Sequence, residues 1–577
     1  MSQRKLKKIR QSEKTVVAEI KKDKLPSFWG ILMKNWKFLL AILLLAGGLY
    51  ANAMKGDFVS DDYASITQET RVGDISHMFS GGSNFGNSQT LTTFLIYKIF
   101  GNSSPVPYHL VSLIYFLVFC VLGYGLVVLI TKNDWVAKIA MVLFVFLPIH
   151  VEAVSWISGR IYIILGIYIV AALINFIYYI DSEKLKYLIG SGGFFLLGFL
   201  TDKPRPFAVF LLMALYVLYF GVEKIKKSWW KVIGISLLVG VAAVAVAWPN
   251  ITKRINIVNS GYNTSESIFY NPFFQYPTGV SKYLQLLWFP SDLTLYHTMY
   301  VLPTWLNWAI ILTYILAIVY FFFKNKPYFF ALAFIMAATL PSISPIKVSW
   351  LVAERYMFLG SWGFCLFLAL IIFDLSKYFK LVAPVLVGCL ISYYGVRLVL
   401  RNTDWRTNHS LWVNTCQVSP NSHNAWNNIG DDYDKLKDYE NAVKGFTQST
   451  LIKPNYADAY HNRANILFKG GRLDLARESY GIALNFSPNL YQTYLSLCQI
   501  DLNEKRYDLA LSHAEAAMKI EPTNPQPAYV AAITYAQMGD IKSAKVILTQ
   551  IVETNPQFTL ANTALSQLNA METGSTQ

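Results

Sequence analysis

Ionisable side chains gather beside the apolar segments of this chain, and they occur in alternate loops. They are Asp61 and Asp62 in FVSDDYAS, His150 and Glu152 in PIHVEAVSWISGR, Lys203 and Arg205 in TDKPRPF, and Glu354 and Arg355 in LVAERYMFLGS. Charged groups next to membrane segments are energetically costly, which makes each of them a candidate for function. Because alternate loops share one side of a membrane, these residues can converge at one membrane face.

This set of side chains suits group transfer from a negatively charged, lipid-linked donor. The carboxylate of Asp61 or Asp62 can accept the proton of an acceptor hydroxyl. Nearby cations can stabilise the charge that develops on a departing phosphate in a site partly shielded from water. Sugar transfer also develops positive charge at the anomeric carbon, which a second carboxylate would stabilise. A divalent metal ion could bind beside the acid pair, but no ligand spacing demands one, and we assign no metal ligand.

Each of these residues also has a structural interpretation. Asp61 and Asp62 could cap a helix in the loop, because aspartate is a good N-cap residue. Arg160 and Arg355 could anchor the ends of membrane spans at the lipid headgroups. The gathering of charges at one face favours a functional role for the acid pair, and both aspartates are candidates for the catalytic base.

The elements that must position these residues are apolar segments in the first 400 residues. Of the 577 residues, 54% are hydrophobic and only 15% are charged, which is too apolar for an ordinary soluble chain. Stretches of roughly 16–24 apolar residues are long enough, or nearly so, to cross a hydrocarbon core of about 30 Å. We predict about eleven spans, near Phe38–Met54, His109–Ile130, Lys138–Pro148, Ile161–Ile180, Tyr187–Leu200, Phe207–Gly221, Val232–Trp248, Trp305–Phe323, Tyr328–Leu340, Tyr356–Phe373 and Leu381–Leu400.

The positions of the basic residues that give the net charge of +15 indicate the membrane topology. Basic residues fill the amino-terminal leader, residues 1–37, and then recur in every second loop, which by the positive-inside rule places these parts in the cytoplasm. The loops with the charged pairs then lie outside, and an odd number of spans places the carboxy-terminal region outside too. The sequence Ala51-Asn52-Ala53 leaves open a signal-peptidase cleavage after the first span. The five cysteines are scattered and predict neither disulfides nor a zinc site.

A 34-residue proline period follows the apolar region, at Pro420, Pro454, Pro488, Pro522 and Pro556. This period is typical of tetratricopeptide repeats, which are helix pairs. We predict four repeats over residues 423–558, preceded by a connecting helix within residues 401–422 and followed by a capping helix and tail at 559–577. Small residues at each helix crossing fit this pattern, namely Gly430, Ala464, Cys498 and Ala532. The fold class is therefore all-α, a polytopic membrane domain at 38–400 followed by a helical solenoid with a concave, peptide-sized groove.

Several segments together carry a resemblance to a known family. They are DDYASI, LTTFLIYKIFGNSSPVPYHLVSLIYF, LPIHVEAVSWISGR, SKYLQLLWFPSDL, LVAERYMFLGSWGF and RNTDWRTNHSLWVNTCQVSPNSHNAWNNIG. Over about residues 36–560 the chain resembles the transmembrane and tetratricopeptide-repeat O-mannosyltransferases and their prokaryotic relatives, within the C-type (GT-C) membrane glycosyltransferases. The order of HVEAVSWISGR, VAERYMF and the repeats makes this likeness specific.

The resemblance implies an inverting transfer of a hexose from a polyprenyl phosphate to a hydroxyl of protein serine or threonine. It implies that the acidic first external loop supplies the base, that His150 and Glu152 shape the sugar site, and that Lys203, Arg205 and Arg355 lie near the donor phosphate. We add His109, Arg160 and Glu354 to the expected substrate-binding residues. The family pattern has Arg-Pro where this chain has Gln89-Thr90, and Lys-Glu where it has Asp202-Lys203. Mannose therefore cannot simply be carried over as the sugar.

Other functions remain open from the sequence. A membrane scaffold could use the repeats to recruit partners for envelope or complex assembly, and would tolerate replacement of Asp61 and Asp62. A transporter or lipid flippase would show charges near the bilayer midplane, whereas these lie at span ends. A nucleic-acid binder is disfavoured because the basic residues mark membrane borders. We expect the polyprenyl-phosphate sugar, an acceptor protein in the repeat groove and the lipid bilayer as partners.

Overall fold

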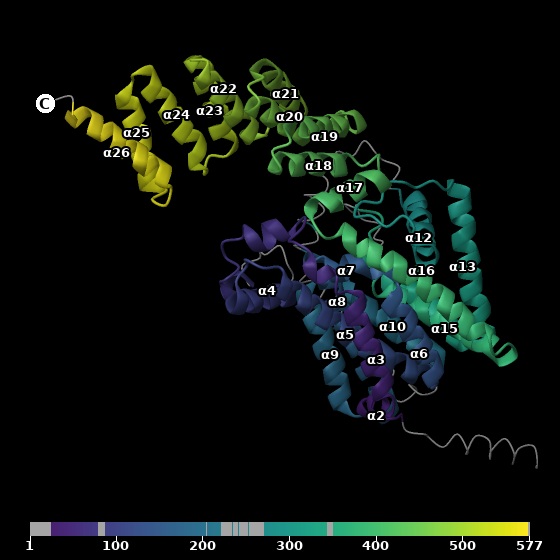
Figure 1. Cartoon of the computed structure of the whole chain (residues 1–577). Helices are drawn as coiled ribbons and strands as arrows, with labels where there is room; N and C mark the ends of the chain where they lie inside the picture. Colours follow the sequence, from purple (N-terminus) through teal and green to yellow (C-terminus); the bar gives the residue numbers. More distant parts are fainter. Residues whose placement is uncertain are drawn as a thin grey trace, which may run out of the picture. The chain divides into compact units, whose positions relative to one another are not determined.

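A computed structural model describes residues 25–78, 87–202, 205–220, 271–342 and 350–574, with four isolated residues between 234 and 252. The described residues form helices and connecting turns, without strands, so the predicted all-α class is confirmed. The chain divides into two compact units, residues 1–411 and 412–577. Helices labelled up to α16 belong to the first unit and the repeat helices from α18 onward to the second (Figure 1).

Among the described residues of the first unit, six helices are long and apolar enough to cross a membrane. They are Trp36–Lys55, Val106–Thr131, Ser158–Ser182, Thr304–Lys324, Gly360–Tyr378 and Val382–Asp404. A seventh is added if α6 (Asp134–Phe146) and the following Pro148–Ser155 segment, bent by 57°, form one span. Shorter apolar helices occupy Leu185–Thr201, Arg205–Phe220 and Lys326–Thr339. The predicted span Val232–Trp248 lies outside the described residues, and the total of about eleven stays a prediction.

Short turns and helices at the ends of these spans hold the charged residues. Pro148 interrupts α6, because proline lacks the amide that would continue the helix, and α7 (Val151–Ser155) follows with a new direction. The 3₁₀ turn η9 (Glu354–Met357) precedes α15 (Gly360–Tyr378). The loop after α3 (Trp36–Leu49) contains the short helix η2 (Tyr63–Thr67) and leads to α4 (Asn87–Phe100). Helix α12 (Pro272–Trp288) precedes α13 (Thr304–Lys324).

After the end of α17 (Asn408–Val418), the described residues of the second unit form four helix pairs and a final helix. The pairs are α18 (His423–Lys435) with α19 (Tyr439–Ile452), α20 (Ala457–Lys469) with α21 (Leu473–Phe486), α22 (Tyr491–Asn503) with α23 (Tyr507–Ile520), and α24 (Pro525–Met538) with α25 (Ile541–Thr554). A Cβ atom on Gly430 would stand 2.8 Å from the Phe446 ring, so only glycine fits this helix crossing. Helix α26 (Thr559–Gly574) buries Ala561 and Leu568 against the last pair.

Candidate functional site

The two aspartates after the first span point into different environments. Asp62 is fully buried, and its Oδ1 accepts hydrogen bonds from the amide and the hydroxyl of Ser158, the former at 2.8 Å. Its Oδ2 accepts the amide of Val59 at 3.3 Å. Asp62 occupies the N-cap position of η2, but its side chain makes no capping hydrogen bond there, so capping does not account for this aspartate. Asp61, in contrast, is exposed. Asp62 therefore binds this loop to the turn at residues 156–160, whereas Asp61 is the accessible carboxylate of the pair.

Burial and neighbouring charges set the protonation of this pair. Burial raises the pKa of Asp62 to about 7, against the opposing effect of its Ser158 hydrogen bonds. Desolvation by the surrounding protein also raises the pKa of Asp61, and the cation of Arg355 partly lowers it again. An accessible carboxylate whose pKa is raised, and which lies within electrostatic range of an arginine, is a candidate general base.

Two arginines and two tyrosines form a compact cluster near this carboxylate. The guanidinium carbon of Arg205 lies 4.9 Å from the ring centroids of both Tyr162 and Tyr356, and that of Arg355 lies 6.0 and 5.0 Å from the same two rings. Arg205 also pairs with Asp202, but its Nε has no hydrogen-bond partner within the described part of the chain. The rings hold the two cations side by side and leave donor capacity for an anion.

Glu152 holds Arg355 in place. This carboxylate is fully buried and forms an ion pair with the Arg355 guanidinium. It also accepts the Arg355 backbone amide at 2.8 Å, which ties α7 to η9. Since both oxygens are engaged by one residue, Glu152 positions an arginine in this structure. The role in shaping the sugar site that the resemblance implies for Glu152 stays a prediction.

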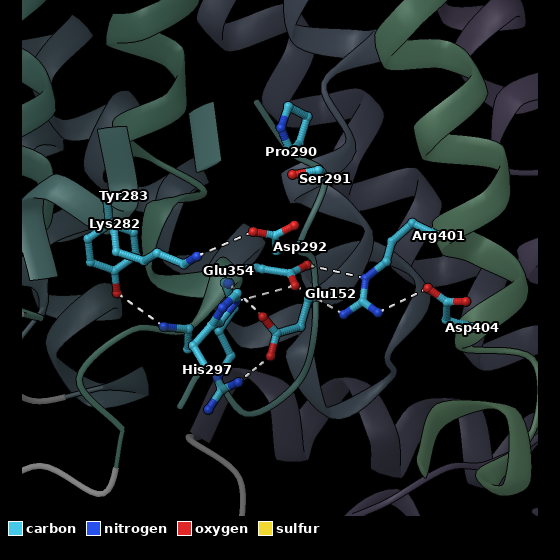
Figure 2. A network of polar contacts seen from close by, with 12 residues as sticks. Glu152, Lys282, Tyr283, Pro290, Ser291, Asp292, His297, Glu354, Arg401 and Asp404 are labelled. Carbon is cyan, nitrogen blue, oxygen red and sulfur yellow. Dashed lines mark hydrogen bonds and ion pairs between the residues drawn. The ribbon is translucent and has the colours of Figure 1, made fainter. Parts of the chain in front are cut away.

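A second buried ion pair adjoins the first. Glu354 binds Arg401 of α16 (Val382–Asp404) through both carboxylate oxygens, at 3.1 and 3.4 Å, and Arg401 also contacts Asp404 at 3.1 Å. His297 lies 3.6 Å from Glu354, and Figure 2 shows these residues around Glu152. Burial raises the pKa of Glu354 to about 7, against the effect of Arg401, and lowers the pKa of His297 to about 3, so this imidazole is neutral.

Sequence reasoning missed part of this network. Arg401 and His297 were not candidates, nor was Lys282, which pairs with Asp292 at 3.7 Å (Figure 2). Arg401 could have been found, because an arginine directly after the last apolar segment, Leu381–Leu400, is itself a signal. His297 lies in the loop between α12 and α13, and Lys282 lies in α12. Only the fold brings them into the network around Glu354.

Three predicted site residues are held away from the arginine cluster. His150 bonds the Ser361 hydroxyl at 2.7 Å and packs on the Phe144 ring at 4.0 Å, and His109 lies 3.2 Å from the Gly56 carbonyl. Arg160 is fully buried and donates only weakly to Ile157, at 3.4 Å. Their contacts in this structure join helices and turns, and their role in binding stays a prediction. Lys203 lies outside the described residues.

An apolar pocket opens beside η9. It lies between α12, α13 and α14 (Lys326–Thr339) and is lined by Val280, Tyr283, Leu284, Tyr314, Ile335, Met336, Thr339 and Met357. Met357 follows Arg355 by two residues, so the pocket adjoins the arginine cluster along the chain. In the part of the chain that the structure describes, no group of three or more metal-ligating side chains is close enough to hold an ion.

The raised pKa of Asp61 predicts a specific pH dependence for any reaction in which Asp61 is the base. A base acts only when deprotonated, so the rate should rise with pH through the pKa of Asp61. Because desolvation raises that pKa, the acid limb should have its midpoint above the ordinary aspartate value of about 4. The pH profile of kcat/KM measures this midpoint. A flat profile from pH 4 to 8 would contradict the role of Asp61.

These features define a helical membrane protein with a buried ionic network and a repeat unit. Tetratricopeptide-repeat family models match residues 423–456, 457–490 and 502–568. The chain is 23% identical to human "Protein O-mannosyl-transferase TMTC3" over 76% of its length and 54% of the relative's. It is 26% identical to the Caenorhabditis elegans "Protein O-mannosyl-transferase F38B6.6" over 70% of its length and 62% of the relative's. These matches confirm the resemblance to this family of transmembrane and tetratricopeptide-repeat proteins.

The chain spans about half to three fifths of the length of the curated relatives that it matches over most of its own length. The mouse TMTC3 relative shows the same range, at 23% identity over 86% of this chain and 61% of the relative. Among solved structures, a tetratricopeptide-repeat protein described as "YrrB" is 19% identical and covers 33% of this chain and 96% of its own, with a TM-score of 0.25.

Proposed function

We propose that this protein is a membrane glycosyltransferase that moves a hexose from a polyprenyl phosphate to a hydroxyl group of an acceptor protein. The proposal is carried by the accessible carboxylate of Asp61, which interacts electrostatically with Arg355, and by the stacking of Arg355 and Arg205 on the same two tyrosines. The printed names of the relatives, protein O-mannosyl-transferases, support the transfer of a sugar to protein.

The reaction needs one displacement. Asp61 accepts the proton of the acceptor hydroxyl, and the hydroxyl oxygen forms its bond to the anomeric carbon. The bond from that carbon to the phosphate oxygen breaks, and the electron pair leaves with the lipid phosphate. Arg205 and Arg355 stabilise the charge on this leaving group. Attack from the face opposite the phosphate inverts the configuration at the anomeric carbon.

The remaining parts of the donor and acceptor have places in this proposal. In this proposal the first isoprene units follow the apolar side chains around Met357, because these units come directly after the phosphate; the pocket there, about 10 Å³ in this structure, must widen to admit them. The repeat unit docks the acceptor protein, as the concave groove of a helical solenoid can bind a peptide. The positive-inside pattern of the loops supports an extracytoplasmic active face, with the amino terminus in the cytoplasm and the repeats outside.

Transfer in proteoliposomes tests the proposal. The purified protein is supplied with radiolabelled polyprenyl-phosphate mannose, polyprenyl-phosphate glucose or the matching nucleotide sugars, together with extracted acceptor proteins. The proposal predicts that label reaches protein from one lipid-linked hexose and from neither nucleotide sugar. If no lipid-linked donor is consumed, the protein is instead a scaffold that recruits partners through its repeats.

Replacing Arg205 should weaken the use of the donor. In Arg205→Gln the stacked cation is lost, so the apparent KM for the lipid-linked donor should rise by about tenfold, or roughly 1.4 kcal/mol, within the range of one charge-assisted hydrogen bond. Arg205→Lys should recover only part of this loss, because an ammonium lacks the planar fork. Donor titrations of the transfer rate measure both values. An unchanged KM in Arg205→Gln would remove Arg205 from the phosphate site.

A further inference from the structure

The backbone of Ser60 is strained immediately before the two aspartates. Its φ is 52°, in the left-handed region that glycine adopts freely and that other residues adopt at a cost. The other described non-glycine residues with positive φ follow helix ends or lie in turns between repeat helices, where this conformation is common. They are Lys132, Glu183, Lys437 and Lys505. Of these five residues, Ser60 is the one that adjoins the candidate base.

Strain of this kind persists only where the surroundings fix it. The Oδ1 atom of Asn408 accepts the amide of Ser60 at 2.9 Å, and three residues earlier the amide of Asp57 donates to the carbonyl of Arg406 at 2.8 Å. On the other side of the turn, Asp62 accepts the amide of Val59. The consecutive amides of Val59 and Ser60 are thus each held by a side chain, that of Asp62 and that of Asn408.

Asn408 is itself held firmly. It is the first residue of α17 (Asn408–Val418), directly after Thr407. The Thr407 hydroxyl accepts the amide of Ser410 at 3.1 Å, and the Ser410 hydroxyl accepts the amide of Thr407 at 3.0 Å. This reciprocal cap fixes the start of the helix and hence the direction from which Asn408 approaches Ser60.

We propose that Asn408 is a positioning residue of the transfer reaction, which fixes the left-handed turn at Ser60 and thereby aims Asp61 into the site. The inference rests on the proposed function. The turn separates the two acids, so that Asp62 is buried against Ser158 while Asp61 stays accessible. If Ser60 relaxed to an extended conformation, the direction of the following side chains would change, and the base would leave its place beside Arg355.

Three variants of the full-length protein test this role. Asn408→Ala should lower kcat by tenfold or more and change the donor KM by less than twofold, because the phosphate site is untouched. Asn408→Asp keeps an acceptor oxygen and should retain most of the activity. The double variant Ser60→Gly/Asn408→Ala should recover most of kcat, because glycine adopts the turn without help. A purely structural role would not produce this rescue.

Hydrogen exchange of residues 57–67 gives a readout that does not depend on transfer. Exchange should be faster in Asn408→Ala and near the wild-type rate in Asn408→Asp. If the wild type transfers sugar but Asn408→Ala has unchanged kcat, or if glycine at position 60 gives no rescue, the inference is overturned. If the wild type transfers nothing, the proposed function fails. In that case hydrogen exchange still tests the contact: an unchanged exchange rate in Asn408→Ala would show that Asn408 does not fix the turn at Ser60. If Asn408→Ala alone does not fold, the double variant Ser60→Gly/Asn408→Ala still tests the inference, because it should fold and keep most of kcat; an inactive or unfolded double variant would overturn the inference.

Discussion

Asp61→Asn should reduce the rate of sugar transfer by about 10²–10⁴-fold, the usual contribution of a general base. The amide is nearly the same size but cannot accept the hydroxyl proton, so kcat should fall while the donor KM changes little. Transfer of label from the lipid-linked hexose, measured at saturating donor, gives the ratio directly.

Asp57→Asn is the matched control for this change, because Asp57 is an exposed acid in the same loop. It should keep transfer within about twofold of wild type, as expected for a surface substitution. Asp62→Asn keeps an oxygen for the Ser158 hydrogen bonds and should cost less than Asp61→Asn. If Asp62→Asn were the inactive variant and Asp61→Asn were active, the assignment of the base within the pair would be reversed.

Glu152→Gln should be strongly destabilising. It leaves the Arg355 guanidinium buried without its counter-charge, and breaking a buried pair in this way costs about 3–5 kcal/mol. Because Glu152 also accepts the Arg355 amide, η9 should loosen and the donor KM should rise. Thermal unfolding in detergent, followed by loss of monodisperse protein, measures the stability.

Lys377→Ala is the control for this second prediction. Lys377 forms an exposed ion pair with Asp374 at 2.7 Å in the same unit, and exposed pairs contribute only about 0–1 kcal/mol. Its unfolding temperature should therefore stay close to that of wild type. Equal unfolding temperatures for Glu152→Gln and wild type would show that Glu152 is not needed to hold Arg355.

The sequence predicted the fold class because two strong periodicities carry it. The apolar segments and the 34-residue proline period each repeat many times, so local errors do not change the conclusion. The bend after α6 at Pro148 and the shortness of several apolar helices could not be predicted in the same way, because tertiary packing decides where a helix ends and where a span begins. Residues such as Gly430 could be assigned to a helix crossing because the repeat itself fixes their geometry.

The candidate site was predictable only in part. Asp61, Arg205 and Arg355 became candidates because a charge beside an apolar segment is visible in the sequence. The different environments of Asp61 and Asp62 were not visible, because the burial of Asp62 depends on Ser158, which lies 96 residues away from it. His150 follows the same sequence rule as Asp61, yet it packs against Phe144, because the bend at Pro148 turns it into the protein interior.

The most direct measurement is an experimental structure with a bound, unreactive donor, a polyprenyl phosphonate whose hexose is linked through carbon. The account predicts that the phosphonate oxygens lie within hydrogen-bond distance of Arg205 and Arg355, with the anomeric carbon facing Asp61 and the first isoprene units in the pocket beside Met357. Density for the phosphonate away from both arginines, or a sugar turned away from Asp61, would contradict it.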